Sequence, residues 1–188
     1  VDRQELLRVL CPGGVAFCTT DHEQLASNKI TKPWPEDVDQ WTHYLHDPSG
    51  NPVARDQRVG PPRHLQGTAD APYSRTHKHL PSIEAMVSTG GRIFYIADQA
   101  AAASIRQPAR WELVARDASN GLLLWQVPVP TWFPHIVNWG ATPPQLQRRL
   151  VAVADRVYVT LGLHAPLSAV DAATGRTVKV YDGTLGAE

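Results

Sequence analysis

An internal repeat within residues 87–184 constrains the fold of this chain more than any other feature of its sequence. Each copy runs through a strand pattern, a loop, a second strand pattern, a tight turn of the form Asp-x-x-x-Gly and a further strand pattern. Asp117 and Gly121 bound the turn of the first copy, and Asp171 and Gly175 bound that of the second. Units of this kind stack on their neighbours, because one unit cannot bury its apolar face alone. The repeat therefore predicts a mainly β fold of about two four-stranded antiparallel sheets.

The composition of the turns and strands agrees with that prediction. Glycine supplies the positive φ that a tight turn requires, and an aspartate side chain accepts hydrogen bonds from the turn amides. The flanking segments are rich in Val, Leu, Ile and aromatic residues, which suit a half-buried sheet. The first copy also carries an insertion over residues 98–111 that the second mostly lacks. Such insertions usually map to one loop face of a repeat protein.

The turn residues and the aromatic residues that follow them resemble the repeat of PQQ-like β-propellers, the blades shared by quinoprotein alcohol dehydrogenases and an outer-membrane assembly lipoprotein. The matching positions are Ala115, Asp117, Gly121, Trp125, Ala169, Asp171, Thr174, Gly175 and Tyr181. In that family a Trp four residues after the turn glycine packs between blades, and Trp125 fits that place, whereas Lys179 occupies it in the second copy. The resemblance implies a partial β-propeller over residues 87–188, with about two four-stranded antiparallel blades, preceded by a short α/β remnant and an irregular linker.

The stretch from Trp41 to Val153 also resembles the start of the propeller in a bacterial group of large PQQ-like repeat proteins. Gly67 and Ser119 depart from that pattern, because each stands where an aromatic residue is expected. A large-to-small change at a buried packing site costs several kcal/mol, so each departure weakens the packing if it is buried. The resemblance to part of a propeller predicts that the chain is a fragment of a larger protein.

Residues 1–30 predict a different kind of structure. An apolar pattern over residues 6–10 indicates a short amphipathic helix, which Pro12 and the two following glycines end before a strand at residues 15–20. Residues 7–15 resemble the segment after the core sheet of class I S-adenosylmethionine-dependent methyltransferases. The glycine-rich cofactor loop of that fold does not occur in this sequence, so the resemblance implies a remnant of such a domain. Residues 31–86, with frequent proline turns, are expected to form a linker, a leading strand and a long loop.

Candidate metal ligands are few. Two histidine pairs are weak candidates, namely His43 with His46 and His77 with His79. On a strand, residues two apart face the same side and could share a metal ion. Ordinary loop histidines in polar surroundings are the competing interpretation. Cys11 and Cys18 lie seven residues apart, which suits neither a zinc knuckle nor a redox pair, and leaves open a disulfide or two free thiols.

A ligand rim is the second candidate site. Trp132, His135 and Trp139 could line a pocket, because aromatic side chains stack on sugars and cofactors. Packing between blades is the alternative use of such residues. The resemblance to quinoproteins would imply PQQ with Ca²⁺ as cofactors only if the parent protein is an active quinoprotein.

The charge balance limits the classes of partner. Lys plus Arg and Asp plus Glu number 18 each, so the net charge is zero, which argues against nucleic acid as a partner. The apolar runs are too short to span a membrane. The first residues do not have the pattern of a secretory signal peptide, although the resemblance implies an extracytoplasmic, periplasmic protein. The expected partners are other propeller blades of the parent or a second copy of the chain.

These features favour a non-catalytic β-propeller module that acts as a scaffold for protein or ligand binding. The first alternative is part of a PQQ-dependent quinoprotein oxidoreductase whose active site is completed by missing blades. A weaker alternative is a methyltransferase remnant. Two blades leave unpaired strand edges and exposed faces, so we expect the chain alone to be marginally stable or to associate with itself.

Overall fold

The computed structural model describes residues 2–18, 29–58, 60–61, 63–64, 83–101, 106–133 and 144–185. The chain divides into two compact units. One consists of Val1–Asp39 with Asp56–Gly60, and the other of Gln40–Arg55 with Pro61–Glu188. The predicted sites at Gly67, His77, His79, His135 and Trp139 lie outside the described residues.

The smaller unit contains helix α1, Arg3–Val9, and a short antiparallel pair of strands, β1, Val15–Phe17, and β2, Lys29–Thr31. The Asp2 side chain accepts a hydrogen bond from the Gln4 amide and caps the helix N-terminus. The chain then turns through Gly13, whose φ of 75° suits glycine. The helix, turn and strand occur where the sequence predicts them, with a shorter strand. Cys11 and Cys18 are both free thiols, so they form no disulfide.

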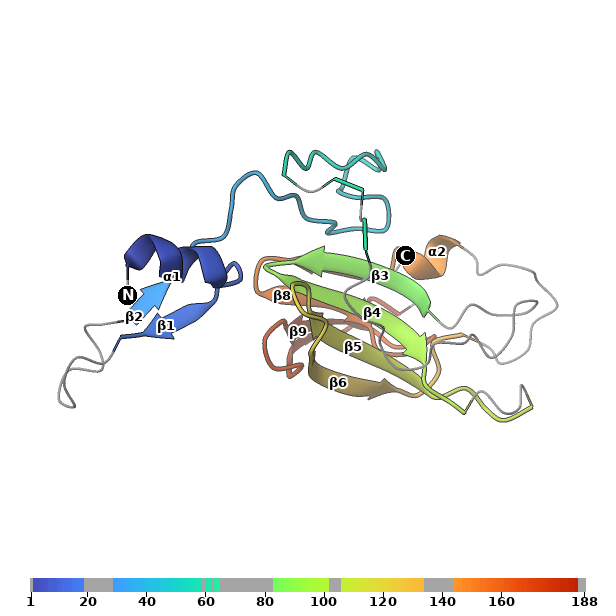
Figure 1. Cartoon of the computed structure of the whole chain (residues 1–188). Helices are drawn as coiled ribbons and strands as arrows, with labels where there is room; N and C mark the ends of the chain where they lie inside the picture. The colour runs from blue at the N-terminus through green and yellow to red at the C-terminus, as the bar shows by residue number, and fades with distance from the viewer. Residues whose placement is uncertain are drawn as a thin grey trace. The chain divides into compact units, whose positions relative to one another are not determined.

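The larger unit contains two four-stranded antiparallel sheets (Figure 1). The first sheet has the order β3-β4-β5-β6, from strands Ile83–Thr89, Arg92–Asp98, Trp111–Asp117 and Leu123–Val129. The second sheet consists of β7, Leu150–Val153, β8, Arg156–Thr160, β9, Leu167–Asp171, and β10, Thr177–Tyr181, which are neighbours in chain order. A short helix, α2, Pro144–Gln147, precedes β7. The prediction of a mainly β chain with antiparallel sheets of four strands is confirmed.

The two sheets have the same register at corresponding positions. Phe94 pairs with Ala115, which pairs with Trp125, across the first sheet. Tyr158 pairs with Ala169, which pairs with Lys179, across the second. Because side chains alternate along a strand, corresponding positions lie on corresponding faces of the two sheets.

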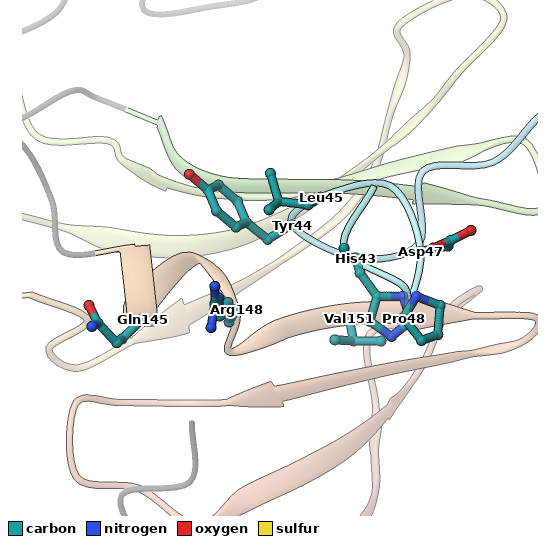
Figure 2. Close-up of a pocket in the computed structure, with 9 residues that line it drawn as sticks. His43, Tyr44, Leu45, Asp47, Pro48, Gln145, Arg148 and Val151 are labelled. Carbon is teal, nitrogen blue, oxygen red and sulfur yellow. The ribbon is translucent and has the colours of Figure 1, made fainter. Parts of the chain in front are cut away.

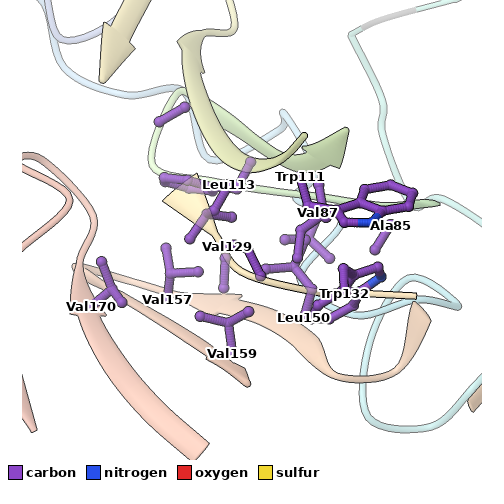
Figure 3. Close-up of a cluster of buried hydrophobic side chains, with 14 of the residues drawn as sticks. Ala85, Val87, Trp111, Leu113, Val129, Trp132, Leu150, Val157, Val159 and Val170 are labelled. Atoms are coloured by element: carbon purple, nitrogen blue, oxygen red, sulfur yellow. The ribbon is translucent and has the colours of Figure 1, made fainter. Parts of the chain in front are cut away.

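The main hydrophobic core lies between the two sheets, as Figure 3 shows for part of it. The first sheet contributes Ala85, Val87, Phe94, Ile96, Leu113 and Ala115, and the second contributes Leu150, Ala152, Val157, Val159 and Val170. Trp132 and Phe133, from the connection between β6 and β7, also belong to it. Burying these apolar side chains is the dominant favourable term that holds the two sheets together.

The segment over residues 40–46 links the first strands of the two sheets. The Ser88 amide in β3 donates to the Trp41 carbonyl oxygen over 2.6 Å, and the Ala152 amide in β7 donates to that of Thr42 over 3.0 Å. The sequence predicts a leading strand within residues 31–86, which include this segment. The structure instead has an isolated antiparallel bridge between His43 and His46. Its backbone groups are satisfied by two different sheets, which explains why it forms no regular element of its own.

Neither of the helices in the described part of the chain has the length and apolar character needed to cross a lipid bilayer.

Candidate functional site

The two Asp-x-x-x-Gly turns are built in the same way. The Asp117 carboxylate accepts from the backbone amides of Ser119 and Asn120 over 2.8 and 3.1 Å. The amides of Gly121 and Gly175 each donate to the carbonyl oxygen of the Asp that opens the turn, over 2.9 Å, and both glycines have a φ of 74°. The turn residues predicted as blade motifs therefore stabilise the backbone locally.

In the second turn a side-chain hydroxyl also donates to the Asp carboxylate. The Asp171 carboxylate accepts from the amides of Ala173 and Thr174 and from the Thr174 hydroxyl, over 2.9 to 3.1 Å. The Thr174 hydroxyl bond is the main reason why the pKa of Asp171 is lowered. The two amides and Arg156 act in the same direction, and burial opposes them.

This lowered pKa predicts a pH dependence of stability. A carboxyl group whose pKa falls on folding stabilises the folded state above its ordinary pKa, near 4, and loses that contribution as the pH falls below it. Asp171→Asn removes the titration, so the stability difference between the wild type and Asp171→Asn should shrink as the pH is lowered from about 6 to about 3. Urea unfolding at several pH values measures this. A difference that stays constant with pH would contradict the assignment.

The indole of Trp125 packs directly on the second turn. Its Nε1 donates to the Ala172 carbonyl oxygen over 3.1 Å, and its ring lies 5.8 Å from that of Phe94. A Cβ built on Gly175 would meet ring carbons of Trp125 at 2.8 Å, which is closer than side chains tolerate. The second turn therefore requires glycine at position 175 for two reasons, namely its positive φ and the close approach of the indole.

Among the described residues, the first turn has no neighbour comparable to Trp125. A Cβ built on Gly121 would meet no atom of the described residues within 4 Å. Gly121 and Gly175 occupy equivalent turns with the same φ of 74°, so they differ in what packs on them rather than in backbone conformation.

Lys179 stands in the second sheet where Trp125 stands in the first. Its ammonium lies 4.7 Å from the centroid of the Tyr181 ring, in a cation–π arrangement. Lys179 pairs with Ala169, which pairs with Tyr158. That face of the second sheet points away from the first, because the alternate positions of β7, β8 and β9 belong to the core between the sheets. Val151, Val153, Tyr158, Leu167 and Tyr181 share this outer face by register. The second sheet thus carries a further apolar face.

The remaining predicted site residues fall into different places. His46 is 3% exposed and packs edge-on against Trp41, and the His43 ring contacts the Thr42 hydroxyl at 2.8 Å. No group of three His, Cys, Asp or Glu side chains that could hold a metal ion occurs among the described residues. Trp132 is completely buried in the core between the sheets. Ser119 is exposed in its turn, so a small residue there leaves no cavity.

A surface pocket of about 410 Å³ lies within the larger unit (Figure 2). One wall is the loop over residues 43–50, and the other is formed by α2 and the start of β7. Its lining includes Tyr44, Leu45, Gln145, Arg148 and Val151, none of which the sequence predicted as a site. The adjacent arginines at 148 and 149 are a local signal, but sequence spacing alone does not bring them to the 43–50 loop.

Two titratable groups also line this pocket. Burial lowers the pKa of His43, and the charge of Asp47 opposes that effect, so the imidazole is neutral at pH 7. Hydrogen bonds from the side chain and backbone of Ser49 are the main causes that lower the pKa of Asp47, and the Arg55 charge adds to them. Asp47 is therefore ionised at pH 7, and Arg55 pairs with it at 3.0 Å.

Compared with known proteins, the chain matches no family model and no curated protein.

Proposed function

We propose that this chain is a non-catalytic binding scaffold made of two consecutive β-propeller blades that belong to a larger ring. The observation that carries the proposal is the packing of Trp125, from the outermost strand of the first sheet, on the Gly175 turn of the second. In addition to the shared core between the sheets, one aromatic side chain of the first sheet thereby packs on a turn of the second, where a glycine makes room for it. Repeats that stack by such neighbour contacts form extended binding surfaces.

The arrangement of the strands supports the same proposal. The first strands of the two sheets, β3 and β7, are in contact, and the segment over residues 40–46 hydrogen-bonds to both. Each sheet then continues outward in chain order to an exposed last strand, β6 or β10. Blades around a common axis would meet at their first strands and present their last strands to solvent, so this arrangement supports the proposal.

The pair of sheets has an exposed surface at each end, and the two surfaces are complementary. The Gly121 turn has room for an incoming indole, and the outer face of the second sheet repeats the positions with which the first sheet packs on the second. The occupant that fits each end is another four-stranded sheet of the same kind, from the parent protein. In its absence, a second copy of the chain offers the same complementary surfaces, head to tail.

Lys179→Trp tests this docking geometry. The introduced indole should dock on the Gly121 turn of a second copy, so the variant should associate at concentrations about tenfold lower than the wild type, because burying an aromatic anchor contributes 1–2 kcal/mol or more. Sedimentation velocity over a concentration series measures this.

Two control variants make the result specific. Val178→Trp places the same side chain at an exposed neighbouring position of β10, and it should associate like the wild type. Gly121→Ala in the Lys179→Trp background should reverse the gain, since a Cβ occupies the space the indole needs. Equal association of Lys179→Trp and Val178→Trp would sink the proposal.

The quinoprotein alternative is tested separately by the melting temperature with and without PQQ and Ca²⁺. Among the described residues, no group of three His, Cys, Asp or Glu side chains could hold a metal ion. A ligand that binds only the folded state raises the melting temperature. The scaffold proposal expects no change, and a saturable rise that needs both additives would overturn its non-catalytic part.

A further inference from the structure

We propose that the pocket between the 43–50 loop and α2 binds a small organic carboxylate with an apolar body, and that Arg148 holds its charged group. This goes beyond the scaffold function, because it assigns a ligand class to a site that lies within one compact unit and needs no further blade.

The size and walls of the pocket suit the body of such a ligand. Its volume of about 410 Å³ lies within the range of small-molecule sites, roughly 300–1,000 Å³. Leu45, Pro48 and Val151 supply apolar contacts, and the Tyr44 ring can stack on an aromatic body. Pockets of this kind obtain affinity from the apolar walls and orientation from a few polar groups.

Arg148 is the group that sets the sign of the ligand charge. Within the described part of the chain it forms no hydrogen bond or ion pair, whereas its neighbour Arg149 donates to the Leu163 carbonyl oxygen over 2.9 Å. A guanidinium always carries its charge and offers a planar fork of donors that matches a carboxylate. Gln145 lines the pocket on the same short stretch of chain and adds an amide donor.

The one acidic side chain in the lining does not cancel this preference. The Asp47 carboxylate is already engaged by the Ser49 hydroxyl and amide and by Arg55. Figure 2 shows Asp47 at the opposite end of the pocket from Arg148 and Gln145. The Asp47–Arg55 pair is neutral overall, and His43 is neutral at pH 7, so Arg148 leaves the pocket with a net positive charge.

Benzoate is the probe that tests this assignment on the full chain, with amide and methyl NMR signals as the readout. We expect saturable binding with a dissociation constant of about 1 mM, as suits a ligand of this size, and shifts centred on Leu45 and Val151. Arg148→Gln should weaken binding about tenfold or more while leaving the remainder of the spectrum unchanged. Arg176→Gln, which removes an exposed arginine in a turn outside the pocket lining, should bind benzoate like the wild type.

Benzamide separates charge recognition from apolar contact. It has the same shape as benzoate without the charge, so it should bind the wild type at least tenfold more weakly and should not distinguish Arg148→Gln from the wild type. Three results would each overturn the inference. The first is the lack of a saturable shift with benzoate up to about 50 mM. The others are equal affinity of the wild type and Arg148→Gln for benzoate, or equal affinity of the wild type for benzamide and benzoate. None of them bears on the docking of Lys179→Trp, so the two proposals fail independently.

Discussion

Gly175→Ala is expected to lower the free energy of unfolding by about 2–5 kcal/mol. A residue with a Cβ in the left-handed region costs about 1–2 kcal/mol, and Gly175 has a φ of 74°. The new Cβ would also meet the Trp125 ring at 2.8 Å, and overpacking of this kind costs about 1–3 kcal/mol. The indole is rigid and its Nε1 is held by the Ala172 carbonyl oxygen, so it cannot move aside without losing that bond. Urea unfolding followed by circular dichroism measures the loss.

Gly121→Ala is the matched control for this prediction. It has the same φ of 74° but no atom of the described residues near the new Cβ, so only the conformational cost of about 1–2 kcal/mol applies. In a Trp125→Ala background the cost of Gly175→Ala should fall to that of Gly121→Ala, because the ring that it strikes is gone. Equal costs for the two glycine variants in the wild-type background would show that Trp125 does not pack on the second turn.

Trp132→Ala is expected to destabilise the protein by about 3–5 kcal/mol, the range for truncating a buried aromatic side chain. Trp132 has no exposed surface and lies between the two sheets, in contact with the core of both. The cavity left behind would therefore remove packing from both sheets at once. Thermal and urea unfolding measure the change, provided that both report a single cooperative transition.

Trp132→Phe separates packing from hydrogen bonding at the same position. The Trp132 Nε1 finds no hydrogen-bond acceptor among the described residues, so replacing the indole with a phenyl ring removes no bond there and should cost less than about 1.5 kcal/mol. Leu124→Ala, at a residue that is 44% exposed on β6, should change stability by about 0.5 kcal/mol or less. A large loss in Trp132→Phe, close to that of Trp132→Ala, would mean that the indole nitrogen is bonded in solution.

The local elements were the part that the sequence predicted well. The turns that begin at Asp117 and Asp171, the strands around them and the helix before Pro12 depend on residues that are close in sequence. Hydrogen bonds from a carboxylate to amides two and three residues ahead, and a glycine at positive φ, require no tertiary contact. Such signals can therefore be recognised in a single sequence.

Two expectations, for Trp132 and Ser119, depend on whether the side chain is buried, which the sequence does not show. The sequence allows Trp132 to line a ligand rim or to pack between blades. The structure buries it in the core because a sheet lies on each side of it. Ser119 was expected to weaken the packing if buried, and it is exposed. A sequence pattern shows which side chains are apolar, but the exposed fraction of each depends on what the second sheet covers.

The pocket was not predicted at all, for a related reason. Tyr44 and Arg148 lie about a hundred residues apart in the chain. They share a pocket because the segment before the 43–50 loop is hydrogen-bonded to both β3 and β7, and the loop and α2 then form the two walls. No spacing or motif connects them, so only the completed tertiary structure brings them together.

By itself, the sequence determined the mainly β character of the chain, its two four-stranded antiparallel sheets and the turns that need glycine, since these follow from local conformational preference and from the alternation of apolar residues. Only the tertiary structure decided which glycine receives the Trp125 indole, which face of each sheet is covered and where Arg148, which pairs with none of the described residues, meets apolar walls. Those outcomes depend on contacts between residues distant in sequence, whose geometry is set when the two sheets pack and exclude water from the core between them.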